Sequence, residues 1–244
     1  VLGDIYKILI RRSEKKIIAT SSHVIVASED MAFRHSRKIN KSVPKTVIEN
    51  GFECLNKTDY KKHEKEDVTF VYSGTLYAEQ DIIPVIDLLR SLDTSRLIRV
   101  IFIGSNVQGA IQNKLNNLKS EFFDIVFLPK MSKKDAKRIE EEADAFLMFK
   151  YGNLDGVPSS KLYNYLSYQK PIICYPTDNG IIHQICTDTQ RNILSGINIK
   201  MNIEKYVNLS EYRKSIIEII TKSSVDKYSR ASQSKKIIEI IDKL

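Results

Sequence analysis

Cysteine and histidine are scarce in this sequence of 244 residues. Its three cysteines, an odd number without CxxC spacing, predict free thiols in a reducing compartment rather than a disulfide framework or a zinc knuckle. The four histidines are scattered and show neither HExxH spacing nor a pair placed to share a ligand, so they predict no bound metal. We therefore expect the chemistry of the chain to rest on other side chains.

Long apolar runs are also missing. A membrane-spanning helix needs about 20 apolar residues in succession, whereas the longest runs here, such as Val24 to Ala27, have the length of a strand. The chain begins at Val1 without the basic flank, apolar core and cleavage site of a signal peptide, and we expect a trimmed piece of a longer protein. The sequence predicts a cytoplasmic protein that does not cross a bilayer.

The composition is that of a globular protein with a basic surface. Hydrophobic residues make up 42% of the chain and charged residues 28%, which excludes disorder. The net charge is +8, and residues 1–66, with 14 basic and 9 acidic side chains, carry +5 of it. Such an excess favours anionic partners. Nucleic acid, an anionic membrane surface and a phosphorylated small molecule all remain open on this ground.

The first quarter of the chain is separated from the rest by a polar, lysine-rich stretch at residues 56–67, which has the composition of a linker. Residues 1–55 predict part of a first domain. Its expected elements are a basic amphipathic helix at Ile5–Ile18, a buried strand at His23–Ser28, a helix at Glu29–Ser36 capped by Ser28, and a strand at Lys45–Glu49 that ends on the turn dipeptide Asn50-Gly51.

Apolar strands alternate with helical patterns after the linker, which is the signature of βαβ units. The expected strands are Val68–Tyr72, Leu97–Ile103, Ile125–Leu128, Ala145–Phe149 and Pro171–Tyr175, and the expected helices are Asp81–Leu92, Val107–Leu118, Ser132–Glu142 and Ser159–Tyr168. Residues 68–200 therefore predict an α/β fold, a Rossmann-like parallel sheet with helices on both faces. Residues 201–244 predict two C-terminal helices, whose isoleucine stripes we expect to face the core: Ile216, Ile217 and Ile220, then Ile237, Ile238 and Ile241.

Two loops are candidates for a ligand site, because ligands of open parallel sheets bind beyond the carboxyl ends of the strands. The first, Tyr72 to Leu76, contains Gly74, whose missing side chain allows a ligand to approach the backbone. The second, Asp155 to Leu166, runs from a loop into a helix. Its glycine and proline shape the loop, and Ser159 and Ser160 offer caps and hydroxyl groups.

Lys161 is the sharpest local signal, because a cation in the first turn of a helix opposes the helix dipole. A bound diphosphate would offset that conflict. The alternative is a lysine side chain that turns away into solvent. Asn164 follows one turn after Ser160 and Lys161, and its amide can hydrogen-bond a ribose hydroxyl.

These residues carry a resemblance. The run from Gly156 to Ile173 resembles the donor-site helix of family 4-type glycosyltransferases of the GT-B fold (glycosyl transferases group 1) and the Lys-Pro strand that follows it. Further landmarks follow in the expected order: Val68–Leu76 resembles the strand and glycine turn that open the C-terminal domain, Val100–Gly104 its second strand, Val126–Pro129 the loop that cradles the base, and His23–Met31 with Val47–Glu53 the end of the N-terminal domain. The resemblance covers most of the chain.

The resemblance implies a retaining, metal-independent, hexosyltransferase-like enzyme without a cofactor. It would transfer a sugar from a nucleotide-diphosphate sugar to a glycan or lipid-linked acceptor hydroxyl, in surface polysaccharide or glycoconjugate synthesis. Residues 1–55 would be the remnant of the acceptor domain, and no catalytic residue is identified. The implied donor-binding residues are Gly74, Thr75, Leu128, Pro129, Lys130, Asp155, Gly156, Val157, Pro158, Ser159, Ser160, Lys161 and Asn164.

Two positions depart from the family's pattern. The family has two glutamates eight residues apart, where this sequence has Gly156, beside Asp155, and Asn164. The family also often places arginine and lysine after the first glycine turn, where Thr75, Gln80 and Asp81 stand here. Lys161 would then hold the phosphates nearly alone.

Other partners and activities follow from these departures and from the charge. A non-catalytic nucleotide-binding or scaffolding subunit remains the second hypothesis. Nucleic-acid binding rests on charge alone, without an interleaved basic-aromatic strand motif, so we predict no nucleic-acid partner. The basic helix Ile5–Ile18 predicts a peripheral contact with an anionic membrane surface.

Overall fold

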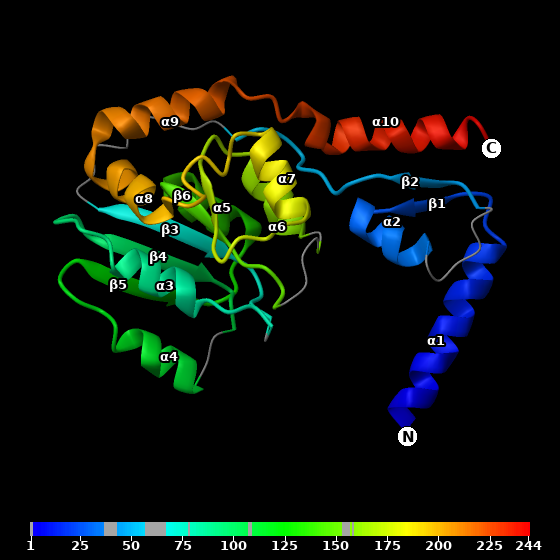
Figure 1. The fold of residues 1–244 in the computed structure, drawn as a ribbon, viewed down its shortest axis with the longest axis horizontal. Helices are drawn as coiled ribbons and strands as arrows, with labels where there is room; N and C mark the ends of the chain where they lie inside the picture. Colours follow the sequence, from blue (N-terminus) through cyan, green and yellow to red (C-terminus); the bar gives the residue numbers. More distant parts are fainter. Residues whose placement is uncertain are drawn as a thin grey trace.

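The structure, a computed structural model, describes residues 2–36, 43–56, 67–77, 79–106, 109–152, 157 and 159–244. The chain opens with α1 (Leu2–Ala19), β1 (Val24–Val26), α2 (Glu29–Ser36) and β2 (Lys45–Val47). Strands β1 and β2 pair in parallel as a small sheet of their own. Helix α1 runs away from the larger sheet, and the N-terminal elements lie at one end of the molecule (Figure 1).

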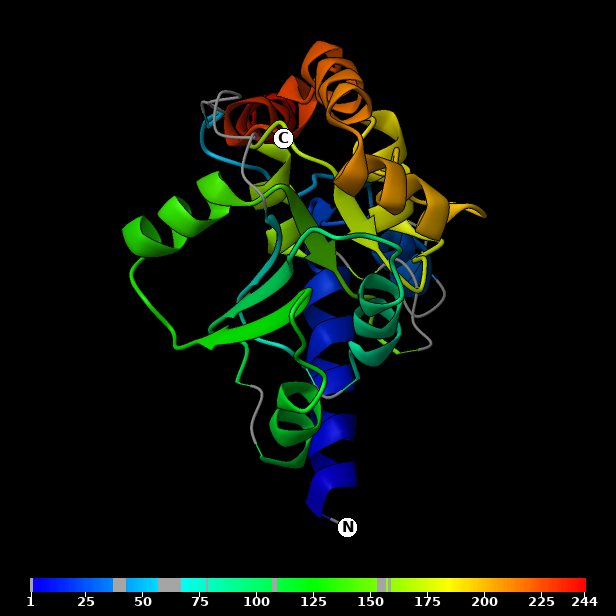
Figure 2. The ribbon, with the colours of Figure 1, turned by 90° about the vertical axis from the view of Figure 1, so that its left-hand side faces the viewer.

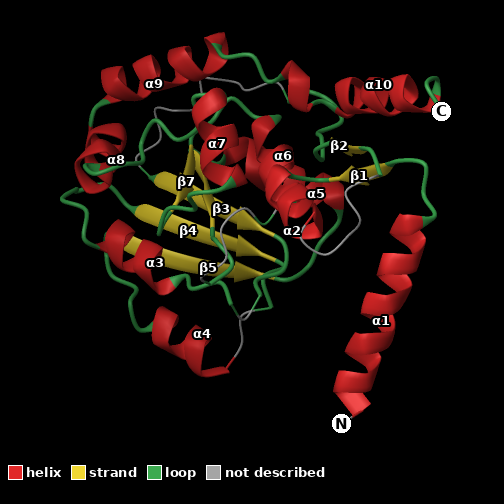
Figure 3. Cartoon of the chain, turned by 45° about the vertical axis from the view of Figure 1, so that its right-hand side comes forward, coloured by secondary structure: helices red, strands yellow, loops and turns green. Residues whose placement is uncertain are grey.

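The larger sheet has five parallel strands in the order β5-β4-β3-β6-β7. They are β3 (Val68–Ser73), β4 (Ile98–Ile103), β5 (Phe123–Leu128), β6 (Ala145–Met148) and β7 (Ile172–Cys174). The helices around them are α3 (Ile83–Arg90), α4 (Gly109–Asn116), α5 (Lys133–Glu142), α6 (Ser160–Leu166) and α7 (Ile181–Asp188). Figure 3 shows α5 beside α6 over one part of the sheet and α3 and α4 at another.

The C-terminal part consists of α8 (Ile199–Asn208), α9 (Ser210–Lys222), the short 3-10 helix η2 (Asp226–Tyr228) and α10 (Arg230–Ile241). Helices α9 and α10 lie along the same side of the molecule in both views (Figure 1, Figure 2). Sequence patterns predicted two helices here. That prediction is wrong, because the apolar spacing does not show the break at Leu209, which ends α8 and precedes α9.

Two hydrophobic cores lie on the two faces of the larger sheet. Phe70 and Phe102 belong to the core that α3, α8 and α9 cover, whereas Val71 and Phe146 belong to the core that contains α6 and α7. Successive residues of a strand point to opposite faces, so a strand with both faces covered is apolar throughout. The predicted Rossmann-like α/β sheet with helices on both faces is confirmed.

The cap predicted at Ser28 forms, and Ser132 caps α5 in the same way. The Ser28 hydroxyl accepts a hydrogen bond from the Met31 backbone N–H at 3.2 Å, and the Ser132 hydroxyl accepts one from the Asp135 N–H at 3.2 Å. The Asp135 carboxylate accepts from the Ser132 hydroxyl at 2.6 Å. Each cap satisfies an N–H group that the first turn of a helix leaves without an intrahelical partner.

Three local predictions are wrong. The second isoleucine stripe is exposed, at 37% for Ile237, 56% for Ile238 and 62% for Ile241, because α10 extends past the five-stranded sheet. The strand predicted to be buried at His23–Ser28 is only partly buried, with Ile25 44% exposed. Gly51 packs against another segment rather than forming a tight turn, since a Cβ there would lie 2.7 Å from the backbone nitrogen of Arg230.

A buried guanidinium joins the ends of three helices. Arg191 is 1% exposed, and its Nη1 donates to the carbonyl oxygens of Thr189 at 2.8 Å and Ile220 at 3.2 Å. Its Nη2 donates to the carbonyl oxygens of Leu166 and Tyr168 at 3.5 and 3.3 Å. These carbonyls lie at the C-terminal ends of α6, α7 and α9, where helix dipoles concentrate negative partial charge.

We expect Arg191→Met to lower the free energy of unfolding by about 3 kcal/mol or more, because methionine removes the buried donor of several hydrogen bonds and replaces none of them. Urea denaturation of both proteins measures the change. Arg138→Met is the matched control: this arginine is exposed on α5 and pairs with Asp135 at 4.0 Å, so its loss should change stability by about 0.5 kcal/mol or less. A loss below about 1 kcal/mol for Arg191→Met would contradict the role of Arg191 in joining the three helix ends.

Lys170 is a second buried cation and covers the C-terminal end of α5. Its Nζ donates to the carbonyl oxygens of Glu140 at 2.8 Å and Glu141 at 2.7 Å. Burial lowers the pKa of Lys170 to about 8. The unfolded chain, with an ordinary lysine pKa of 10.5, therefore binds more protons between these two values.

Because the unfolded state binds the extra proton, this lysine makes the free energy of unfolding rise with pH from about 8 upward. We expect the difference in unfolding free energy between the natural protein and Lys170→Met to grow by about 2 kcal/mol between pH 7.5 and 9.5. Paired denaturation curves at both pH values measure this change. The ionisation of the tyrosines affects both proteins equally, so its contribution cancels in the difference. A difference independent of pH would show that Lys170 keeps an ordinary pKa.

Candidate functional site

The order in which the chain adds strands to the parallel sheet reverses at β3. From β3 the chain adds β4 and β5 on one side, and then β6 and β7 on the other. The loops after β3 and β6 therefore leave in opposite directions, and in open α/β sheets the crevice between such loops is where ligands bind. The first of the two loops predicted from the sequence, Tyr72 to Leu76, lies at the end of β3.

Gly74 follows β3 with a backbone φ of +103°, in the left-handed region that favours glycine. A Cβ at this position would lie 2.9 Å from Cε of Lys161. The side chain of Lys161 thus takes the space that the glycine leaves, and the approach of a ligand to the Gly74 backbone stays a prediction. The structure brings the two predicted loops together at this point.

Lys161 does not turn into solvent. Its Nζ donates to the carbonyl oxygen of Thr75 at 3.1 Å and lies 5.2 Å from the ring centre of Tyr72 and 5.8 Å from that of Tyr77. Burial lowers the pKa of Lys161. The ammonium group is thus partly stripped of water and held at the crevice by a carbonyl and two aromatic faces.

Helix α6 is tied to β3 by Tyr165. The hydroxyl oxygen of Tyr165 accepts a hydrogen bond from the Ser73 backbone N–H at 2.7 Å, and the Tyr165 ring stacks on Phe146 with centroids 4.2 Å apart. Helix α6 has only seven residues, so its dipole is weak. The charge of Lys161 therefore attracts an anion more strongly than the helix dipole does. Ser159, at the N-cap position, makes no side-chain capping bond, which differs from the predicted cap.

The loop after β3 is fixed by Gln80, which is 7% exposed. Its Nε2 donates to the carbonyl oxygen of Phe149 at 2.9 Å, which links the loop to the end of β6. Its Oε1 accepts from the Tyr72 hydroxyl at 3.2 Å and from the Tyr77 N–H at 3.1 Å. Sequence reasoning singled out Gln80 only as a missing cation, and the buried contacts show its role in holding the loop.

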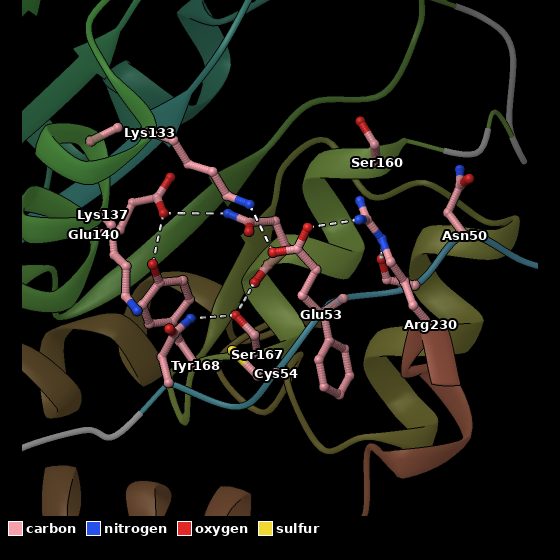
Figure 4. Close-up of a pocket in the computed structure, with 15 residues that line it drawn as sticks. Asn50, Glu53, Cys54, Lys133, Lys137, Glu140, Ser160, Ser167, Tyr168 and Arg230 are labelled. Carbon is pink, nitrogen blue, oxygen red and sulfur yellow. Dashed lines mark hydrogen bonds and ion pairs between the residues drawn. The ribbon is translucent and has the colours of Figure 1, made fainter. Parts of the chain in front are cut away.

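A pocket of about 250 Å³ lies between α6 and α5 (Figure 4). It is bounded by α5, by α6, by residues 50–54 and 56, and by Arg230. Polar side chains dominate its wall, among them Glu53, Lys133, Lys137, Glu140, Ser160 and Asn164. The sequence predicted the last two of these as donor-binding residues.

Glu53 joins three elements at this pocket. Its carboxylate accepts from Lys133 Nζ of α5 at 2.9 Å and from Arg230 Nη1 of α10 at 2.8 Å. The hydrogen bond from Lys133 and the charges of both cations hold the pKa of Glu53 below its usual value. Nothing in the sequence pattern indicated this cluster, because its members are far apart along the chain.

The other predicted site residues are placed less closely together. Asn164 lines the pocket and donates from Nδ2 to Oε2 of Glu140 at 3.3 Å, while Lys161 faces Gly74. Leu128 ends β5, which lies three strands away from β6 in the sheet. Residues 128–130 are not part of the pocket wall as the described residues define it. Val157 is described, whereas the predicted residues Asp155, Gly156 and Pro158 lie outside the described residues.

Searches for other kinds of site gave negative results within the described ranges. Those residues contain no group of three or more His, Cys, Asp or Glu side chains able to hold a metal ion. None of the helices that the structure describes has the length and apolar character needed to cross a membrane.

Comparisons with known proteins identify the fold. No family model and no curated protein matches the chain. Among solved structures, HepE of Anabaena in complex with UDP and glucose has a TM-score of 0.68 at 15% identity, covering 96% of this chain and 67% of that one. This chain has the fold of the GT-B glycosyltransferases.

Other solved structures agree. Sucrose-phosphate synthase of Thermosynechococcus elongatus gives a TM-score of 0.67 at 10% identity, over 96% of this chain and 61% of that one. TarM gives 0.60 at 16% identity, over 93% of this chain and 45% of that one. The GT-B chain described here thus spans between about half and two thirds of the length of these proteins.

Proposed function

We propose that this chain is the donor-binding part of a glycosyltransferase and that it binds a nucleotide-diphosphate sugar at the crevice between the loops after β3 and β6. The observation that carries the proposal is the position of the Lys161 ammonium. It lies 3.1 Å from the Thr75 carbonyl oxygen, at the point where the strand order reverses. HepE, which has the same fold, was solved in complex with UDP and glucose, and this supports a nucleotide sugar as the ligand.

The proposed binding step is an exchange of partners at Lys161. A diphosphate oxygen replaces the Thr75 carbonyl as the acceptor, and a desolvated cation thereby gains a full counter-charge. Gly74 lets the Lys161 side chain lie against the backbone at this point, because a Cβ there would lie 2.9 Å from Cε of Lys161. When the bond between the sugar and the diphosphate breaks, negative charge collects on the leaving group, and a cation already fixed in place stabilises it.

The finer parts of the proposal rest on the resemblance of the donor-site helix. They are a retaining, metal-independent course without a cofactor, hexosyl transfer, a glycan or lipid-linked acceptor, a role in polysaccharide or glycoconjugate synthesis, and a cytoplasmic location. The division at residues 56–67 also stays a prediction. A non-catalytic nucleotide-binding subunit is the second candidate, favoured by Gln80, whose side chain is committed to holding the loop.

We expect Lys161→Ala to weaken the binding of a nucleoside diphosphate by about tenfold to a hundredfold, because a charge-assisted hydrogen bond is lost. Binding of the corresponding nucleoside should change little, since it has no phosphate for Lys161 to contact. Titration calorimetry with UDP, GDP and ADP, and with uridine, guanosine and adenosine, measures both.

Lys134→Ala is the control for the charge, because it removes an exposed lysine of α5 outside the pocket wall. It should bind each diphosphate as the natural protein does. If Lys161→Ala also retained full affinity for the diphosphate that binds best, the proposed role of Lys161 would be wrong.

Peripheral membrane contact through α1 also stays a prediction. The helix exposes Ile5, Leu9 and Ile17, each more than half exposed, and carries basic residues such as Arg12 and Lys15. Apolar and basic groups together favour an anionic lipid surface. We expect co-sedimentation with vesicles to rise with their content of anionic lipid and to fall with salt, and equal binding to neutral vesicles would exclude this contact.

A further inference from the structure

Two tyrosines from different loops meet beside Lys161, and the binding step above does not use them. Tyr77 follows the glycine turn after β3, and Tyr151 follows the end of β6. The centres of their rings lie 5.3 Å apart, and the ring planes are tilted by 42°. Neither residue belongs to α6 or to the donor-binding residues predicted from the sequence. We call Tyr77 and Tyr151 the tyrosine pair.

Contacts between the two loops hold the tyrosine pair in place. The Tyr77 N–H donates to Oε1 of Gln80 at 3.1 Å. Nε2 of the same glutamine donates to the carbonyl oxygen of Phe149, two residues before Tyr151, at 2.9 Å. Gly152 has a φ of +53°, and a Cβ there would lie 3.5 Å from a backbone oxygen of the loop after β3. The two rings therefore stand on backbone segments that are tied to each other.

The ring of Tyr77 is fixed but only partly covered. Its residue is 47% exposed, whereas Tyr72 in the same segment is fully buried. Burial and the neighbouring Tyr77 raise the pKa of the Tyr151 hydroxyl, so this group stays neutral beside a bound anion. The tyrosine pair thus presents an uncharged aromatic surface at the crevice, with polar hydroxyl groups at its edge.

Lys161 fixes which part of the donor reaches this surface. Its Nζ lies 5.8 Å from the centre of the Tyr77 ring. In the proposed function this ammonium stabilises the charge that collects when the bond between sugar and diphosphate breaks, so it contacts the phosphate next to the sugar. That phosphate lies about 3 Å from Nζ. The sugar bonded to it is then brought against Tyr77, and the nucleoside is one phosphate farther away.

The chemistry of a pyranose suits such a surface. Its hydroxyl groups project around the edge of the ring, and its C–H groups form apolar patches on the two faces. An aromatic ring carries negative charge density on its face and attracts the weakly positive C–H groups, while the contact also removes apolar surface from water. The tyrosine hydroxyl groups can exchange hydrogen bonds with the hydroxyl groups of the sugar.

We propose that the tyrosine pair binds the sugar of the donor, with the Tyr77 ring stacked on a C–H face of a pyranose and Tyr151 supporting that ring from behind. This inference rests on the proposed function, because it assigns the sugar of the same ligand. It makes the tyrosine pair a determinant of specificity that distinguishes a nucleotide sugar from the bare nucleoside diphosphate.

The test compares nucleotide sugars with their parent diphosphates. UDP-glucose, GDP-mannose and ADP-glucose are titrated by calorimetry into the natural chain, together with UDP, GDP and ADP, and the nucleotide sugar that binds best is studied further with its diphosphate. We expect Tyr77→Ala to weaken binding of the nucleotide sugar by about fivefold or more. Binding of the diphosphate should change by less than about twofold, because it has no sugar for the ring to contact.

Three further variants separate stacking from a structural role. Tyr77→Phe keeps the ring and should keep the affinity for the nucleotide sugar to within about twofold. Tyr77→Leu keeps apolar volume without an aromatic face and should show the same selective loss as Tyr77→Ala, including where the alanine variant does not fold. Phe122→Ala is the matched control, since this aromatic residue is 45% exposed and precedes β5, at the opposite end of the strand from the ligand loops.

The outcomes distinguish this inference from the proposed function. If Tyr77→Ala and Tyr77→Leu leave the affinity for the nucleotide sugar unchanged, or weaken it and the diphosphate equally, the stacking role is wrong while donor binding stands. Binding of a diphosphate without binding of any of the three nucleotide sugars also overturns it. If the natural chain binds none of the six ligands, the proposed function fails, and the role of the tyrosine pair fails with it.

Discussion

The proposed donor site depends on the contact of Lys161 with the backbone at Gly74 and Thr75. It brings a partly desolvated ammonium group to the point where the strand order of the sheet reverses. A carbonyl oxygen and two tyrosine rings contact the ammonium group there. A neutral carbonyl is a weak partner for a cation in such surroundings, whereas a phosphate oxygen is a strong one. The geometry therefore favours an anionic ligand, and the close backbone favours a compact group such as a diphosphate.

The surrounding fold keeps this contact in place through buried polar groups that bond to main-chain atoms. Gln80 attaches the loop after β3 to the end of β6, and Tyr165 attaches α6 to the end of β3. Arg191 and Lys170 act similarly at helix ends, where they donate to main-chain carbonyl oxygens. Each cation is compensated mainly by carbonyl dipoles. Such networks are specific, because a buried group left without its partners is costly.

The sequence allowed the parallel sheet and the cap at Ser28 to be predicted, because strand runs and serine caps are local signals. Lys161 was predicted from its conflict with the helix dipole. Glu140 was not, since it stands among three successive glutamates and only the packing of α5 on α6 distinguishes it. Arg191 meets carbonyls from distant segments. The stripe at Ile237 has core periodicity but lies on an exposed helix, and periodicity alone does not show what a face packs against.

The proposed donor site requires that a nucleoside diphosphate contact Lys161 and the backbone beside Gly74. An NMR titration of the labelled chain with UDP, GDP or ADP, following backbone amides and the lysine side-chain ammonium, tests this contact most directly. We expect the largest chemical-shift changes at Gly74, Thr75 and the Nζ of Lys161. Saturable binding that leaves these signals unchanged would contradict it.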